Sequence, residues 1–242
     1  MDAMMIEARY SGKSISLSPK VIEHIKTKGY KKVALYASVQ FTQVLEEVIK
    51  QVESLGAEVI SSKPMRTSER YQLLGCISYK SALRLEEEPD AFLYIGDGAF
   101  HPRALVLAQK DEESFKEIIR YDPITGSMSI MGREDCDKIF KKYQASLAKI
   151  LMSKEIGVII TLKPGQQQFK VSRKLRELFP DKNFYFFATE QLDMSQAEDF
   201  NFIEAWINTA CPRIGFDDAA EMNVAMANLT DVLKLSTQPT KK

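Results

Sequence analysis

The sequence predicts an α/β protein made of two similar domains, each built on a largely parallel sheet. Short apolar runs rich in β-branched and aromatic residues alternate with stretches of helical periodicity. The alternation begins again after a long amphipathic stretch at 133–154. A chain of 242 residues, 45% of them hydrophobic, is long enough for two such cores. We therefore expect one domain over residues 1–145 and a second over 146–242, each with helices covering both faces of its sheet.

In the first domain, strands and helices are expected in alternation. The expected strands are 31–41, 57–62 and 90–100. Between the first two, residues 42–56 carry apolar side chains at helical spacing and end at Gly56, which is typical of an amphipathic helix. A shorter helix is expected at 81–88. The stretch Asp122–Gly126 has the Asp, Pro and Gly residues of a tight turn and predicts a hairpin.

The second domain repeats the pattern after a helix at 133–154. The expected strands are 155–167, which ends in a Gly/Pro turn, 182–191 and 201–210. A helix is expected at 168–179, and another over 219–229. The polar tail from 236 to 242 is expected to be disordered.

Charge and composition narrow the function classes. The 33 basic and 33 acidic residues balance, so no net field attracts nucleic acid or an anionic membrane. No apolar run approaches the ~20 residues of a membrane span, and the first residues lack the pattern of a signal peptide. A cytoplasmic protein is the expectation.

The cysteines leave two interpretations open. Cys76, Cys136 and Cys211 are widely spaced without a CxxC pair, which argues against a disulfide framework. They are either unrelated buried thiols or, in part, ligands that converge on a metal or cluster. Because the only histidines are His24 and His101, a zinc site of the usual Cys/His kind is hard to assemble.

Three turns follow expected strands and are marked by glycine or proline. They are GDGAFHP (96–102), LKPGQQ (162–167) and NTACPR (208–213). Ligands of parallel α/β sheets bind beyond the carboxyl ends of the strands, so these turns are candidate binding loops. Gly96 and Gly98 permit close approach of the backbone to a ligand, but a lone GxG also fits a plain strand-end turn.

Polar residues near these turns carry competing interpretations. His101 is either a structural, hydrogen-bonded histidine or part of a site. Arg213, beside Cys211, either forms a buried ion pair or binds a carboxylate through its planar fork. Asp217 and Asp218 either cap and open the helix expected at 219–229 or take part in binding.

Several segments together resemble a known family. VALYASVQF, LLGC, YIGDGAFHP, RYDP, ITLKPGQ and INTACPRIGFDDAA occur in the order seen in diphthamide synthases, the 2-(3-amino-3-carboxypropyl)histidine synthase family, and most resemble its archaeal form. The resemblance runs from about residue 5 to about residue 225. It implies that the two expected domains are the second and third of the family's three similar α/β domains.

The resemblance also implies an activity. Members are dimers that hold a [4Fe-4S] cluster on one cysteine from each domain and cleave S-adenosylmethionine reductively. The 3-amino-3-carboxypropyl radical then adds to a histidine of translation elongation factor 2, the first step of diphthamide formation. By this resemblance Cys76 and Cys211 are cluster ligands, in keeping with the preference of iron–sulfur clusters for thiolates.

Further site residues follow from the resemblance alone. Lys163, Gly165 and Gln166 are expected to line the S-adenosylmethionine pocket, with Arg213 and Asp217 or Asp218 near its amino acid part. A neighbouring wall is expected from Gly96, Asp97, Gly98 and His101.

The sequence departs from the family pattern in one respect. Nothing matches the family's first domain or its Cys-Tyr-Gly-Ala-Cys-Asp segment, and Cys136 matches no family cysteine, so we interpret it as structural or incidental. Three hypotheses follow. The chain is a transferase subunit in a homodimer, or in a heterodimer with a chain supplying the first domain. It is otherwise a non-catalytic accessory or scaffolding subunit, or an α/β protein that has lost the cluster and binds a nucleoside or another small ligand.

Overall fold

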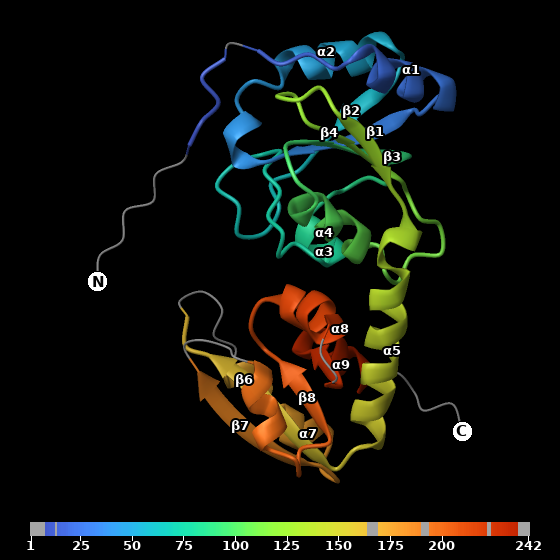
Figure 1. Cartoon of the computed structure of the whole chain (residues 1–242). Coiled ribbons are helices and arrows are strands. Elements are labelled where there is room, and N and C mark those ends of the chain that lie inside the picture. The colour runs from blue at the N-terminus through green and yellow to red at the C-terminus, as the bar shows by residue number, and fades with distance from the viewer. Residues whose placement is uncertain (1–7, 13, 164–168, 190–193, 222–223, 237–242) are drawn as a thin grey trace. The chain divides into compact units, whose positions relative to one another are not determined.

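The structure is a computed structural model and describes residues 8–12, 14–163, 169–189, 194–221 and 224–236 (Figure 1). It divides into two compact units, residues 1–136 and 137–242. The boundary lies at Asp137 rather than at 145/146 because helix α5 (Asp137–Met152) packs on β8 (Ala205–Asn208), β9 (Met226–Asn228) and neighbouring helical segments of the second unit.

The first unit is built on a sheet of order β2-β1-β3-β4-β5. Its strands are β1 (Lys32–Ala37), β2 (Glu58–Ile60), β3 (Ala91–Ile95), β4 (Ile118–Tyr121) and β5 (Met128–Met131). β1 to β4 are parallel, whereas β5 pairs antiparallel with β4. The predicted hairpin turn joins them: the Asp122 carboxylate accepts hydrogen bonds from the Ile124 and Thr125 amides, and Gly126 takes a positive φ of 69°.

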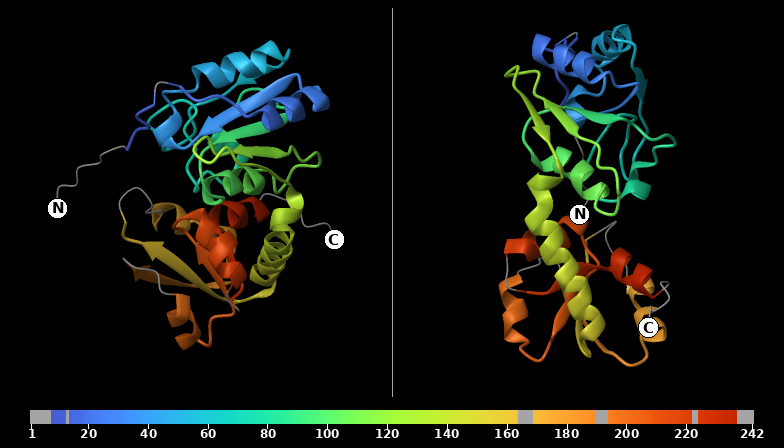
Figure 2. Two further views of the ribbon diagram at one scale, coloured as in Figure 1. Left: turned by 45° about the horizontal axis from the view of Figure 1, so that its top comes forward. Right: turned by 90° about the vertical axis from the view of Figure 1, so that its right-hand side faces the viewer.

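Helices cover both faces of this sheet. They are α1 (Pro19–Lys28), α2 (Glu46–Ser54), α3 (Lys80–Leu83) and α4 (Phe100–Ala108), with 3₁₀ turns η1 (Val39–Phe41) and η2 (Arg133–Cys136). α1 and α2 lie on one face and α3 and α4 on the other (Figures 1 and 2). The expected helix at 81–88 ends early, because Arg84 adopts a left-handed backbone with φ 54°. α4 begins within the turn expected at 96–102.

The second unit has a parallel sheet of order β7-β6-β8-β9. Its strands are β6 (Glu155–Thr161), β7 (Asn183–Thr189), β8 (Ala205–Asn208) and β9 (Met226–Asn228). Its further helical segments are α6 (Phe169–Ser172), α7 (Leu175–Leu178), η3 (Met194–Asp199), the π-helix η4 (Ile214–Asp218), α8 (Ala219–Glu221) and α9 (Leu229–Leu235).

Two sequence predictions for the second unit are corrected. The helix expected over 219–229 is wrong beyond α8: Met226 and Ala227 are fully buried in β9, which pairs with β8. Burial in the sheet therefore overrides the helix-forming composition of this stretch. The helix expected at 168–179 is divided into α6 and α7. The α/β fold with largely parallel sheets is confirmed in both units.

Candidate functional site

In the first unit, Cys76 lies in the loop between β2 and α3, which runs past the carboxyl end of β1. Gln72 forms a parallel bridge with Ala37, the last residue of β1, and the Leu73 amide donates to the Ala37 carbonyl at 2.9 Å. Four residues beyond the bridge, Cys76 is half-buried. The Phe100 ring from the start of α4 packs against Gly75, where a Cβ would lie 2.2 Å from it. Backbone pairing and this ring together fix the position of the thiol.

The GDG turn after β3 lies at the same edge of the sheet. Gly96 has a φ of +153°, and a Cβ there would lie 2.8 Å from the Tyr94 Oη and 3.0 Å from the Ser38 Oγ, so only glycine fits. Burial, and then the nearby carboxylate of exposed Asp97, raise the pKa of Tyr94. Gly98 takes a left-handed φ of +63°. The turn thus rests on two buried hydroxyls that the sequence analysis did not identify.

His101 lies in the first turn of α4, next to Phe100. The two rings meet edge to face with centroids 5.5 Å apart, and Phe100 is 57% exposed. The contact of Phe100 with Gly75 brings this end of α4 beside Cys76. The structure therefore gathers Cys76, the GDG turn and His101 at one edge of the first sheet.

In the second unit, Cys211 follows β8 in a loop held by two buried asparagines. Asn208 donates through Nδ2 to the Cys211 carbonyl at 2.8 Å and to the Asn228 Oδ1 at 2.7 Å. Asn228, at the end of β9, donates through its own Nδ2 to the Pro212 carbonyl at 3.0 Å. Both asparagines are almost fully buried, and Cys211 is half-buried. Neither asparagine was predicted from the sequence, because a single asparagine in an apolar run gives no local signal of its partner.

Arg213 and Asp217 form a buried ion pair across the π-helix η4. The Arg213 Nε donates to the Asp217 Oδ2 at 2.5 Å, and Arg213 is only 4% exposed. The N-cap interpretation of Asp217 and Asp218 is wrong, since both lie inside η4 and the residue before it is Arg213. The Asp217 Oδ1 is buried without a hydrogen-bond partner among the described residues. Burial, followed by the charges of Asp217 and Glu221, raises the pKa of Asp218.

Lys163 is the described part of the LKPGQQ turn. It is exposed just beyond β6, and its amide donates to the Thr161 Oγ1 at 3.2 Å. Because β6 and β8 are parallel neighbours, Lys163 and Cys211 follow their strands at the same edge of the second sheet. Gly165 and Gln166 lie outside the described residues.

The cysteines differ in accessibility. Cys136 is 1% exposed and follows β5, which runs back toward the amino ends of the parallel strands. Within the described ranges, no group of three or more His, Cys, Asp or Glu side chains is placed to hold a metal ion. Cys76 and Cys211, half-buried thiols each at a strand's carboxyl end, suit ligation of an iron–sulfur cluster. Each of these two thiols, taken within its own unit, is accessible enough to bind a metal, whereas the Cys136 thiol is buried.

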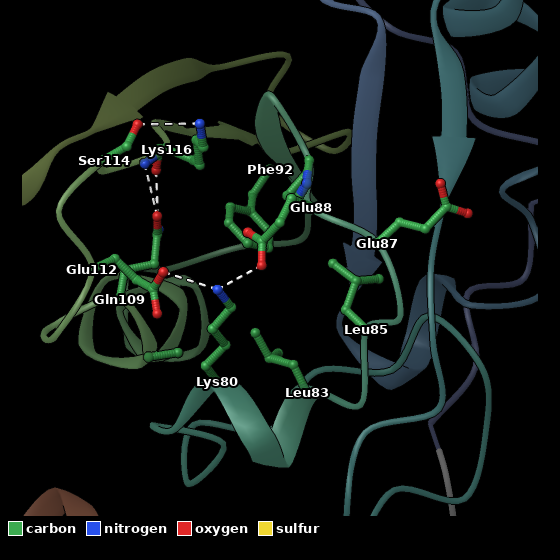
Figure 3. A pocket seen from close by; sticks show the side chains of 12 residues that line it. Lys80, Leu83, Leu85, Glu87, Glu88, Phe92, Gln109, Glu112, Ser114 and Lys116 are labelled. Atoms are coloured by element: carbon green, nitrogen blue, oxygen red, sulfur yellow. Dashed lines mark hydrogen bonds and ion pairs between the residues drawn. The ribbon is translucent and has the colours of Figure 1, made fainter.

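A small pocket of the first unit is lined by residues other than these (Figure 3). It is formed by segments that precede β3 and β4, and it leaves about 30 Å³, room for about one water molecule. Lys80 closes it with ion pairs to Glu88 at 2.5 Å and Glu112 at 2.8 Å. The pocket is therefore at the amino ends of the strands and is no candidate for the site.

A helix that crosses a membrane must be both long and apolar. None of the helices in the described parts of the chain is long and apolar enough to do so.

The fold and the strand-end thiols define a repeat-built α/β protein with cysteines presented at the carboxyl edges of its sheets. The chain matches the model of the family "Putative diphthamide synthesis protein" over residues 4–230, and it belongs to that family. The resemblance inferred from the motifs is thereby confirmed.

Named relatives and solved structures agree with this assignment. The chain is 30% identical over 200 residues to the 2-(3-amino-3-carboxypropyl)histidine synthase of Pyrococcus horikoshii, covering 81% of this chain and 54% of that protein. The chain is 25% identical over 207 residues to the 2-(3-amino-3-carboxypropyl)histidine synthase of Methanocaldococcus jannaschii, covering 82% of this chain and 52% of that protein. A crystal structure of Dph2 from Pyrococcus horikoshii with a 4Fe-4S cluster superposes with a TM-score of 0.73 at 26% identity, covering 94% of this chain and 65% of that chain. The chain thus spans about half the length of the curated relatives it matches.

Proposed function

We propose that this chain is a subunit of a 3-amino-3-carboxypropyl transferase that modifies a histidine of translation elongation factor 2 in the cytoplasm. The observation that carries the proposal is the pair of half-buried thiols at sheet edges, Cys76 and Cys211, in a chain of the diphthamide synthesis family. A relative that shares this fold is solved with a 4Fe-4S cluster. S-adenosylmethionine is the proposed donor of the transferred group.

The residues have distinct proposed roles. Cys76 and Cys211 would hold a [4Fe-4S] cluster, which when bound supplies an electron for reductive cleavage of S-adenosylmethionine. Asn208 and Asn228 position the Cys211 loop through its carbonyls. The buried Arg213–Asp217 ion pair supports the segment that follows that loop, and Lys163 follows the neighbouring strand β6.

A partner chain is part of this proposal. A cubane with one open iron takes three protein ligands, and the described residues offer two suitable thiols. We propose that the third comes from another chain, in a homodimer or in a heterodimer with a chain that contains the family's first domain. The same observation favours the second candidate function, an accessory subunit that supports a catalytic partner without chemistry of its own.

Anaerobic cluster reconstitution tests the proposal. Absorbance and electron paramagnetic resonance spectra would be recorded for the chain alone and with a full-length relative, using Cys76→Ala, Cys211→Ala and, as matched control, Cys136→Ala. We expect a [4Fe-4S] signal beyond that of the full-length relative alone, and we expect the first two substitutions to abolish this additional signal and the control to retain it. Transfer of label from S-adenosylmethionine to elongation factor 2 should likewise be lost in Cys76→Ala and Cys211→Ala and retained in Cys136→Ala. If the partner transfers label equally well with the unchanged chain, with Cys76→Ala and with Cys211→Ala, the accessory function is favoured. If this chain contributes no cluster signal under any condition, the transferase function is excluded.

A further inference from the structure

The edge strand β7 has an unusual composition. Its seven residues, Asn183–Thr189, contain four aromatic side chains and no charge, glycine or proline. β7 pairs over its whole length with β6, and within the described residues no strand lies beyond it (Figure 1). Long, uncharged, hydrophobic edge strands are the ones most prone to pair with another chain.

The hydrogen-bond register shows which backbone groups point away from the sheet. The Asn183 amide donates to the Lys154 carbonyl at 2.8 Å, and the Thr189 carbonyl accepts from the Leu162 amide at 3.0 Å. Odd-numbered residues of β7 therefore turn their backbone groups toward β6, and the even-numbered ones, including Phe184 and Ala188, turn them outward. The outward positions are symmetric about residue 186. An antiparallel pairing with β7 of a second copy would thus place Phe184 opposite Ala188 in both directions.

Arg176 of α7 lies over this outward edge. Its guanidinium donates to the Phe184 carbonyl at 3.3 Å and lies 5.2 Å from the centroid of the Phe186 ring. One side chain thus takes up an outward-facing acceptor and covers the central aromatic ring of the strand. It also adds a positive charge beside a strand whose own seven side chains, Asn183–Thr189, carry none. Two such charges would face each other closely in a symmetric pairing, which is unfavourable.

We propose that the outer edge of β7 is a pairing surface for a second copy of this chain and that Arg176 keeps it closed. The Arg176 side chain opposes edge-to-edge association of two copies. Removing its side chain opens a self-complementary strand whose register favours an antiparallel dimer. The inference concerns the second unit alone and is independent of the proposed function.

Four variants of the full chain test the inference by analytical ultracentrifugation over a range of concentrations. Arg176→Ala is expected to strengthen self-association on the order of tenfold over the unchanged chain. Arg173→Ala, which removes the same charge from an exposed neighbouring position, is the matched control and should behave as the unchanged chain. Ala188→Pro deletes an outward-facing amide without removing a bond to β6, so Arg176→Ala combined with Ala188→Pro should return to the unchanged behaviour. Ala188→Pro alone shows whether proline is tolerated, by its melting temperature.

Hydrogen exchange locates the contact. The Ala188 amide should become protected in the Arg176→Ala variant at high concentration and exchange rapidly when diluted. The inference is overturned if Arg176→Ala associates no more than the unchanged chain, or if Arg173→Ala associates equally. It is also overturned if association persists with Ala188→Pro or without protection in β7.

Discussion

Replacement of Asn228 by alanine tests how the Cys211 loop is built. The Asn228 side chain is 3% exposed and joins two segments: it donates to the Pro212 carbonyl at 3.0 Å and accepts from Asn208 at 2.7 Å. It also packs against Gly215, where a Cβ would lie 2.3 Å from its Oδ1. Alanine would remove both hydrogen bonds while β9 remains paired through its backbone.

The cost follows from these contacts. The two hydrogen bonds contribute about 1 kcal/mol each, and the part-buried Pro212 carbonyl left without its donor costs about 1–3 kcal/mol more. We therefore expect the free energy of unfolding to fall by roughly 3–5 kcal/mol. For a chain of this length about 2–4 °C of melting temperature corresponds to each kcal/mol, so the transition should fall by roughly 6–20 °C.

Two assays separate loop release from general loss of stability. Thermal unfolding followed by circular dichroism gives the shift, and Asn183→Ala, an exposed asparagine whose Nδ2 bonds Glu155, should change stability by less than about 0.5 kcal/mol. Well below the transition, alkylation of the Cys211 thiol, read by mass spectrometry, should be faster in Asn228→Ala because its loop is released. A melting temperature within about 1 °C of the unchanged chain, with an unchanged alkylation rate, would refute the reasoning.

Three further outcomes are expected. Gly96→Ala should lower the free energy of unfolding by about 1–3 kcal/mol, because the added Cβ meets two hydroxyls. Gly98→Ala places its Cβ in open space, so it should lower the free energy of unfolding only by its backbone strain of about 1 kcal/mol. Denaturant titration of the two variants measures the difference. Lys182→Met should lower the melting temperature slightly, because its ammonium donates to two carbonyls at the end of α5, at 2.7 and 2.6 Å. Burial raises the pKa of Glu117, but hydrogen bonds from His24 and a tyrosine outweigh it and hold the pKa below 4.5. The depressed pKa adds stability above pH 4.5 that is lost as the pH falls through the folded-state value, so Glu117→Gln should show a weaker loss of melting temperature between pH 7 and pH 3.

The sequence predicted those elements whose state is set locally. The strand expected at 31–41 contains β1, where Val33 to Ala37 are all buried, and such a short apolar run has few alternatives to a central strand. α1 was not expected, because its buried face rests on only Val21 and Ile25 within a charged stretch. β9 was misassigned since its strand state depends on pairing with β8, a contact that no local pattern reveals.

The candidate site likewise contains some residues that the sequence identified and others that it did not. Glycines and cysteines at strand ends carry a local signal, so the turns that present Gly96 and Cys211 were identified as candidate loops, whereas Cys76 was singled out only by the family resemblance. Their functional roles remain predictions. The hydroxyls beneath the GDG turn and the asparagines behind Cys211 were missed, because each acquires its role from a partner distant in the sequence. The π-helix with its Arg213–Asp217 pair was likewise beyond prediction from spacing.

The polar contacts behind Cys211 extend further into the second unit. The backbone amide of Asn228 donates to the Tyr143 hydroxyl at 2.9 Å, and that hydroxyl donates to the Asp231 carboxylate at 2.6 Å. All three residues are buried. The chain of bonds thus links the loop after β8 with β9, α5 and α9. Each group in this chain has a partner, and a satisfied buried network rigidifies its surroundings. Cys211 is therefore positioned by the core of its own unit before any ligand binds, which is the condition for a thiol to act as a preorganised ligand.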